Sequence, residues 1–109
     1  YPLALDMGRI FENIVFLELR RKAQKISYLK DKQEVDFYYT IDGQEQLLNV
    51  CYDMESPATR EREINGLIGA MKRLSLPESV IVTAEDKETI DTESGRITVV
   101  PLWEWLLER

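Results

Sequence analysis

The sequence predicts an α/β domain in which helices flank a mixed sheet, and three patterns favour this class. Two strand-like runs, residues 34–41 and 44–52, are joined by Asp42-Gly43, a dipeptide typical of a tight hairpin turn. A helical pattern over residues 57–74 separates this hairpin from a buried strand at 79–83, which implies a parallel, right-handed crossover. A long segment whose apolar residues recur at helical spacing precedes the hairpin. The expected order is αβββαβ(β)α.

Composition limits the function classes. The 109 residues suffice for one domain, residues 1–109, and no apolar run approaches the roughly 18 residues of a membrane helix. One cysteine and the absence of a signal peptide fit a cytoplasmic protein. Histidine is absent, which excludes histidine-based catalysis and metal ligation, and the net charge of -6 disfavours broad nucleic-acid binding. Because the first residue is Tyr1, we expect a piece of a longer protein.

The first helix is expected over residues 6–22, with Asp6 as its N-cap or first-turn acid. Its apolar positions wrap most of the surface, which predicts a largely buried helix. Glu18 projects near the middle of the apolar face, and Glu12 lies at its margin. We expect each to reach water or to pair with arginine, and the alternative is a role in a site. The apolar positions are Met7, Ile10, Phe11, Ile14, Val15, Phe16, Leu17 and Leu19.

The remaining elements follow from local signals. A short strand is expected at 26–30, and Ser56-Pro57 predicts the start of the second helix. The mixed charges at 60–63 are typical of a solvated face, with a substrate or phosphate contact by Arg60 or Arg62 as the alternative. Residues 87–91 pair with 96–100 as a small hairpin, and 101–107 form a closing helix. Of its two tryptophans, one is expected in the core and the other on a docking surface. The expected apolar stripe of the second helix is Ile64, Leu67, Ile68, Met71 and Leu74.

An acid in the middle of a predicted strand is unusual, because strands disfavour aspartate. Side chains alternate along a strand, so Asp36 shares a face with Glu34 and Tyr38, whereas Val35, Phe37 and Tyr39 share the other. On the next strand Asn49 and Cys51 share a face. Asp36 therefore predicts a site, a buried ion pair or a wet face.

This order of elements, with an acid on the second strand, resembles the PD-(D/E)XK nuclease-like (restriction-endonuclease-like) fold. Residues 8–12 resemble the helix motif and place Glu12, residues 34–37 place Asp36, and the third-strand motif falls on Asn49 and Cys51. In that family carboxylates hold Mg²⁺, which polarises a phosphate, while a lysine positions the nucleophile. The resemblance implies catalytic roles for Glu12 and Asp36 and a magnesium site formed by them with Asp53.

The third-strand motif departs from that pattern. Asn49 replaces the acid and brings no charge, and Cys51 replaces the lysine and is a poor ligand for Mg²⁺. Asp53 becomes a third carboxylate if the strand continues, and Lys30 or Arg60 are candidates to replace the lysine from another element. A buried, small apolar role is expected for Cys51, because a reactive thiol needs a nearby cation.

A second resemblance covers nearly the whole chain. Residues 8–21, 30–31, 34–37, 49–53 and 59–63 are together similar to an uncharacterised C-terminal domain that follows a P-loop AAA-type ATPase module in archaeal and bacterial proteins. It implies an ATPase parent, with ATP bound in a module absent here, since no G-x-x-x-x-G-K-[ST] stretch occurs. We therefore expect an accessory domain that docks on its own ATPase module or on a partner protein. The alternative is a divergent Mg²⁺-dependent DNA endonuclease.

Overall fold

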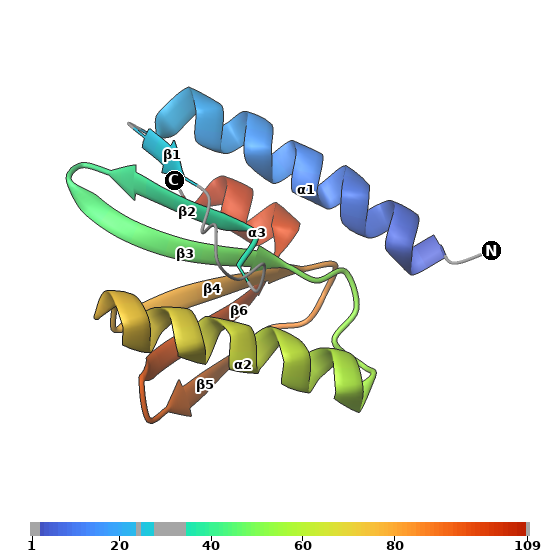
Figure 1. Cartoon of the computed structure of the whole chain (residues 1–109). Helices are drawn as coiled ribbons and strands as arrows, with labels where there is room; N and C mark the ends of the chain where they lie inside the picture. Colours follow the sequence, from blue (N-terminus) through green and yellow to red (C-terminus); the bar gives the residue numbers. More distant parts are fainter. Residues whose placement is uncertain (1–2, 24, 28–34, 109) are drawn as a thin grey trace.

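The computed structural model describes residues 3–23, 25–27 and 35–108 (Figure 1). The elements follow the expected order. They are α1 (Leu3–Lys22), β1 (Lys25–Ser27), β2 (Phe37–Ile41), β3 (Gln44–Val50), α2 (Pro57–Leu74), β4 (Glu78–Thr83), β5 (Glu88–Thr92), β6 (Gly95–Pro101) and α3 (Leu102–Leu107).

The strands form one mixed sheet in the order β1-β2-β3-β4-β6-β5. Strand β3 is parallel to β4, and β4 is parallel to β6, whereas the β1–β2, β2–β3 and β5–β6 pairs are antiparallel. The parallel crossover through α2 and the final hairpin are therefore confirmed, and so is the mixed α/β class. The finer assignment to the PD-(D/E)XK fold stays a prediction.

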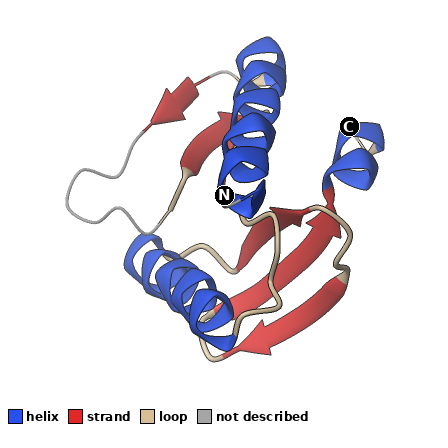
Figure 2. Ribbon diagram, turned by 90° about the vertical axis from the view of Figure 1, so that its right-hand side faces the viewer, coloured by secondary structure: helices blue, strands red, loops and turns tan. Residues whose placement is uncertain are grey.

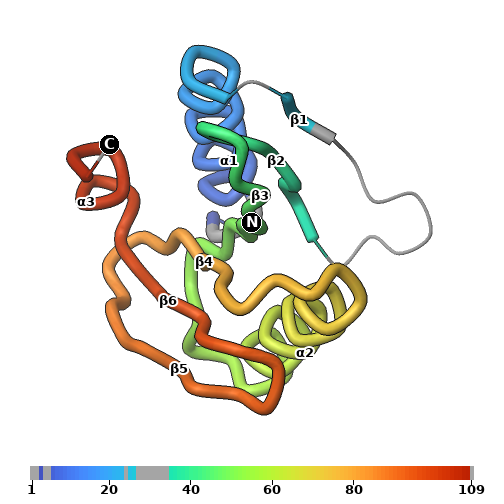
Figure 3. The backbone as a smooth tube through the Cα atoms, turned by 90° about the vertical axis from the view of Figure 1, so that its left-hand side faces the viewer, coloured from blue at the N-terminus to red at the C-terminus, as the bar shows by residue number. Residues whose placement is uncertain are grey.

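Helices cover both faces of the sheet, with α1 and α3 on one face and α2 on the other (Figures 2 and 3). Each face has its own core. The α1/α3 cluster contains Val15, Leu19, Phe37, Tyr39, Leu48, Val50, Val82, Val100 and Leu102. The α2 cluster contains Leu47, Cys51, Met54, Leu67, Ala70, Met71, Ile81, Ile97 and Val99. None of the helices in the described ranges is long and apolar enough to cross a membrane.

The local start and turn signals are confirmed. The Thr59 amide donates to Ser56 Oγ at 3.4 Å at the start of α2, and Pro57 is the first helical residue. Asp42 and Gly43 have φ values of 53° and 79°, as a tight hairpin turn requires. Helix α1 begins at Leu3 rather than Asp6, and Asp6 lies in its first turn.

The predicted strand limits around Asp36 are wrong. Strand β2 begins at Phe37 and β3 ends at Val50, so Asp36 precedes one strand, and Cys51 and Asp53 follow the other. Side-chain bonds replace the backbone ladder here, because Val50 N donates to Asp36 Oδ2 and Asp36 N donates to Asn49 Oδ1. Val35 consequently packs with the α2 cluster rather than sharing a face with Phe37 and Tyr39. Strand β1 begins at Lys25, one residue before the predicted start, and residues 28–30 of the predicted strand lie outside the described ranges.

The burial of α1 differs from the expectation. This helix is not largely buried, because Leu3, Ile10 and Leu17 are exposed. Periodicity locates an apolar side of a helix, but the sheet decides which part of that side it covers. The apolar stripe of α2 is confirmed, since Leu67 and Met71 are buried in the α2 cluster and Ile64, Ile68 and Leu74 pack against it. Trp105 packs against the α1/α3 cluster, as expected for one tryptophan, and Trp103 is exposed, so that its role on a docking surface stays a prediction.

Candidate carboxylate pocket

A pocket of about 460 Å³ lies where α1, the end of β3 and the start of α2 meet. Three acids reach it from different elements: Glu12 from α1, Asp36 from the segment before β2, and Glu63 from α2. Asp53, Arg9 and Arg62 also line it. The remaining lining residues are Gly8, Val50, Cys51, Tyr52 and Thr59.

Asp36 is held in place by the backbone of the neighbouring strand. Its Oδ2 accepts a hydrogen bond of 2.7 Å from Val50 N, and its own amide donates to Asn49 Oδ1 at 2.8 Å. This reciprocal pair fixes the Asp36 carboxylate at the end of the β2–β3 hairpin. One of its oxygens is thereby committed to the backbone.

Asn49 links the hairpin to α2. Its side chain is only 2% exposed, and its Nδ2 donates to Glu63 Oε1 at 2.9 Å. An amide suits this place because it accepts from Asp36 N while donating to a carboxylate. An ionised carboxylate at this position could not donate a hydrogen bond to Glu63 and would repel its charge. Asn49 therefore connects the two acids through one side chain.

The three acids hold their protons more tightly than free carboxyl groups do. Burial and then the Asp36 charge raise the pKa of Glu12, and Arg9 partly offsets this. Burial raises the pKa of Asp36 against the opposing effect of the Val50 amide. Burial and then Asp36 also raise the pKa of Glu63, against the hydrogen bond from Asn49 and the neighbouring Arg62. Asp36 is thus the acid that repels the other two.

The structure brings the sequence-predicted residues Glu12, Asp36 and Asp53 to one pocket. One oxygen of Asp53 accepts from Glu55 N at 2.8 Å and so closes the turn after β3. Within the described ranges, no three acid or cysteine side chains are arranged to hold a metal ion. The assignment of magnesium to Glu12, Asp36 and Asp53 stays a prediction.

Cys51 is buried, as expected, with 8% exposure. Its thiol donates to the carbonyl oxygen of Asp53 at 3.3 Å. Burial, followed by the Glu63 charge, raises the pKa of Cys51 to about 11. This raised pKa favours the protonated thiol at neutral pH, whereas the thiolate is the nucleophilic form.

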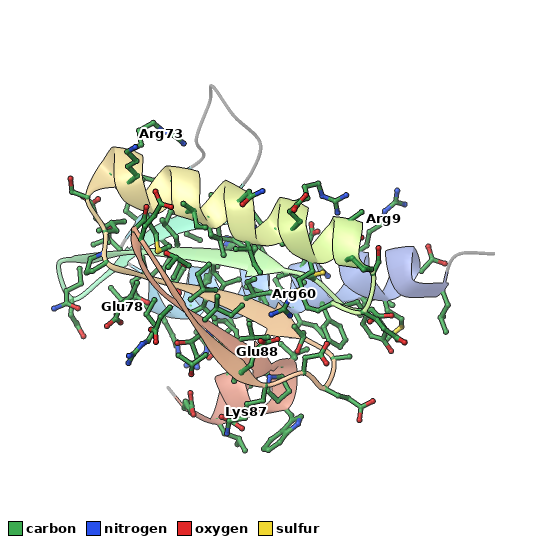
Figure 4. All side chains as sticks on the ribbon, turned by 90° about the horizontal axis from the view of Figure 1, so that it is seen from below. Arg9, Arg60, Arg73, Glu78, Lys87 and Glu88 are labelled. Atoms are coloured by element: carbon green, nitrogen blue, oxygen red, sulfur yellow. The ribbon has the colours of Figure 1, made fainter. Side chains whose placement is uncertain are left out.

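The proposed replacements for the missing lysine lie elsewhere. Arg60 points toward Glu88 of β5 and makes two hydrogen bonds to its carboxylate, of 2.6 and 2.8 Å (Figure 4). It is not among the residues that line the pocket. Lys30 lies outside the described residues. The cations that the described chain brings to the pocket are Arg9 and Arg62.

Sequence reasoning missed Glu63 and assigned the run at 60–63 to a solvated face. A signal was present: Glu63 lies three residues before Gly66, four before Leu67 and seven before Ala70, all of which are buried. Residues at these spacings share one side of a helix. The alternating charges around Glu63 hid its position on the side that faces the sheet. For Glu18 the expectation is confirmed, since it pairs with Arg21 at 2.8 Å and with Lys22 at 3.6 Å.

The fold and the pocket together define a class: an α/β domain whose mixed sheet presents a cluster of acids at the end of its central hairpin. Residues 7–105 match the family described as a domain of unknown function, DUF4143, and the chain belongs to this family. It is 40% identical over 113 aligned residues to the uncharacterized protein MJ1544 of Methanocaldococcus jannaschii. The alignment covers 94% of this chain and 25% of that protein, so the chain spans about a quarter of its relative's length.

Proposed function

We propose that this chain is a non-catalytic accessory domain of a prokaryotic AAA-type ATPase, with a nuclease-like fold whose catalytic set is incomplete. Its role is to dock on its own ATPase module or on a partner protein. The observation that carries this proposal is the Asn49 side chain, which bridges Asp36 N and Glu63. The amide stands where a nuclease of this fold needs an acid.

The chemistry of the pocket supports a structural role for its polar atoms. Asp36 uses one oxygen on Val50 N, Asn49 uses its oxygen on Asp36 N, and Asp53 uses one oxygen on Glu55 N. Phosphodiester hydrolysis needs oxygen ligands that are free for Mg²⁺ and a cation placed near the nucleophile. Cys51 supplies neither, because its thiol is neutral and buried.

The link to an ATPase rests on the sequence. Five segments distributed over residues 8–63 resemble the domain that follows a P-loop module. The relative from M. jannaschii is about four times as long as the stretch it shares with this chain, which leaves room for such a module. Under this proposal ATP binds in that module and not in these 109 residues.

A specific observation favours the alternative, a divergent Mg²⁺-dependent endonuclease: Glu12 and Asp36 line one pocket, where burial and then the Asp36 charge raise the pKa of Glu12. Manganese titration calorimetry distinguishes the two functions, because Mn²⁺ binds carboxylate sites more tightly than Mg²⁺. The chain is titrated beside Asp36→Asn, in which an oxygen is kept for Val50 N. Asp91→Asn, an exposed acid on β5, serves as the matched control.

For an accessory domain we expect no saturable Mn²⁺ binding to the wild-type chain and no cleavage of plasmid DNA in Mg²⁺. Saturable binding that Asp36→Asn abolishes and Asp91→Asn retains, together with DNA cleavage, would overturn the proposal and establish the nuclease. Circular dichroism of each variant verifies that it is folded.

The ATPase link is tested on the full-length M. jannaschii relative. We expect it to hydrolyse ATP, and removal of the quarter that matches this chain should change the rate without abolishing nucleotide binding. Absence of both ATP binding and ATP hydrolysis in the intact relative would refute an ATPase parent.

A further inference from the structure

Helix α1 has a second apolar side that no described element covers. Leu3, Ile10 and Leu17 are 63%, 50% and 55% exposed, although they are large apolar residues. In Figure 1, α1 runs along the upper side of the molecule, and no other described element lies above it. Single exposed apolar residues are ordinary, but a row of them along one helix marks an interaction surface.

The row has the spacing of a helix-pairing seam. Leu3, Met7, Ile10, Ile14 and Leu17 follow one another at intervals of four, three, four and three residues. This is the a/d repeat of paired helices, with Met7 and Ile14 at a and the other three at d. Met7 and Ile14 are partly buried, and Ile14 packs against the α1/α3 cluster. We call these five residues the α1 seam.

The charges beside the α1 seam indicate its occupant. The flanking g positions are Asp6, Asn13 and Arg20, which place an acid near one end and a base near the other. When two such helices pair antiparallel, the g positions of one helix lie beside the g positions of the other. Asp6 then lies beside Arg20 of the second copy, and Asn13 lies near Asn13 of the second copy. A parallel pair instead places Asp6 beside Phe11 and Asn13 beside Glu18, without an opposite-charge pair.

We propose that two copies of this chain associate through their α1 seams, with the helices antiparallel and with two ion pairs between Asp6 of one copy and Arg20 of the other. In this register Met7 packs against Leu17 of the second copy, and Ile10 packs against Ile14. The two-fold axis passes near the middle of α1. The contact is isologous and therefore closes as a dimer rather than a fibre.

The dimer is compatible with the carboxylate pocket. The α1 residues that line the pocket are Gly8, Arg9 and Glu12, and none of them belongs to the seam. Association therefore leaves the carboxylate pocket unchanged, and the mass of the chain and its Mn²⁺ binding report on the dimer and on the pocket separately.

Sedimentation equilibrium on the intact chain tests the proposal by a charge exchange. We expect a dimer at about 100 µM, as for a small interface of modest affinity. Arg20→Asp should weaken it about tenfold, since two like-charge contacts replace two ion pairs. Asp6→Arg combined with Arg20→Asp should restore the affinity to within about threefold of wild type.

This rescue has no explanation within one chain. Asp6 and Arg20 are fourteen residues apart on α1, which is about 21 Å along the helix axis, too far for a direct contact. Arg20 also lies over the Phe16 ring, with its guanidinium carbon 5.8 Å from the ring centroid, and the double variant does not restore that contact. Recovery of the dimer therefore reports the contact between copies.

Two further variants complete the test. Ile10→Arg should leave the chain monomeric, whereas Leu107→Arg on the exposed side of α3 should not. A short thiol cross-linker should join two chains that carry Asn13→Cys, because the two thiols face each other in the dimer. It should not join two chains that carry Arg20→Cys, because residue 20 faces residue 6. The wild-type chain, whose single Cys51 is buried, is the control. A wild-type monomer at about 100 µM, or a dimer insensitive to Ile10→Arg, would overturn the proposal and assign the α1 seam to another occupant.

Discussion

Asn49 and Glu63 illustrate how single residues set the character of the carboxylate pocket. The amide keeps Asp36 and Glu63 connected, while burial raises the pKa values of Glu12, Asp36 and Glu63 and the Asp36 charge adds to the rise for Glu12 and Glu63. The folded chain consequently binds protons at these groups more tightly than the unfolded chain does. By linkage, stability falls as pH rises from about 4, the ordinary carboxyl value, through the raised pKa values.

Glu63→Gln should reduce this pH dependence. Glutamine keeps an oxygen for the Asn49 amide but removes the charge that Asp36 repels. We expect the free energy of unfolding at pH 7 to increase by about 0.5–1 kcal/mol, and its slope between pH 4 and neutrality to decrease. Urea unfolding at a series of pH values measures both.

Glu61→Gln, an exposed acid on the same helix, is the control and should alter neither quantity. If Glu63→Gln destabilised the chain at pH 7, the carboxylate itself would be required at this position. That outcome would contradict the raised pKa of Glu63, because a charge that stabilises the fold lowers the carboxyl pKa.

At the scale of elements, the connection between α2 and β4 is packed against the β5–β6 turn. Arg96 N donates to the Pro77 carbonyl oxygen at 2.8 Å, and Gly95 beside it has a φ of 145°. A Cβ atom built on Gly95 meets the Pro77 carbonyl group. The close approach of two loops and a left-handed backbone both require glycine here.

Gly95→Ala should therefore lower the free energy of unfolding by about 3 kcal/mol or more, through backbone strain and overpacking. Gly43→Ala is the matched variant, because Gly43 also has a positive φ but open space around it. It should cost about 1 kcal/mol. Thermal unfolding of both variants tests the comparison, and equal costs would show that packing against Pro77 contributes nothing.

The elements were largely predictable from local sequence. The Asp42-Gly43 turn, the Ser56-Pro57 helix start and the apolar run at 79–83 each depend on interactions within a few residues. The limits of β2 and β3 were not predictable from local sequence, because the Asp36 and Asn49 side chains replace backbone hydrogen bonds across the hairpin. Side-chain partners of that kind lie thirteen and fourteen positions apart and leave no periodic signal.

At the scale of the whole molecule, one sheet is shared by two cores. Leu48 lies in the cluster beneath α1 and α3, and Leu67 lies in the cluster beneath α2, both fully buried. Strands β3, β4 and β6 contribute to both clusters, so loss of either core exposes the same sheet. We expect the chain to unfold as one cooperative unit.

Leu48→Ala and Leu67→Ala should each lower the free energy of unfolding by about 2–5 kcal/mol, the cost of a cavity in a packed core. Each should shift a single transition seen equally by far-ultraviolet circular dichroism and by tryptophan fluorescence. Leu107→Ala, which is exposed, should change the stability by less than about 0.5 kcal/mol. If the two probes showed separate transitions in either core variant, the two cores would not unfold as one cooperative unit.

The sequence by itself determined the order of elements, the turn and cap chemistry, the mixed sheet and the candidacy of Glu12 and Asp36. These follow from periodicity and from contacts between near neighbours, which a linear sequence contains. The tertiary structure alone decided that Glu63 joins Glu12 and Asp36, that Asn49 connects two of them, and that the outer side of α1 stays exposed. A helix pattern shows that a side is apolar, whereas only the packing of distant elements decides which surface covers it.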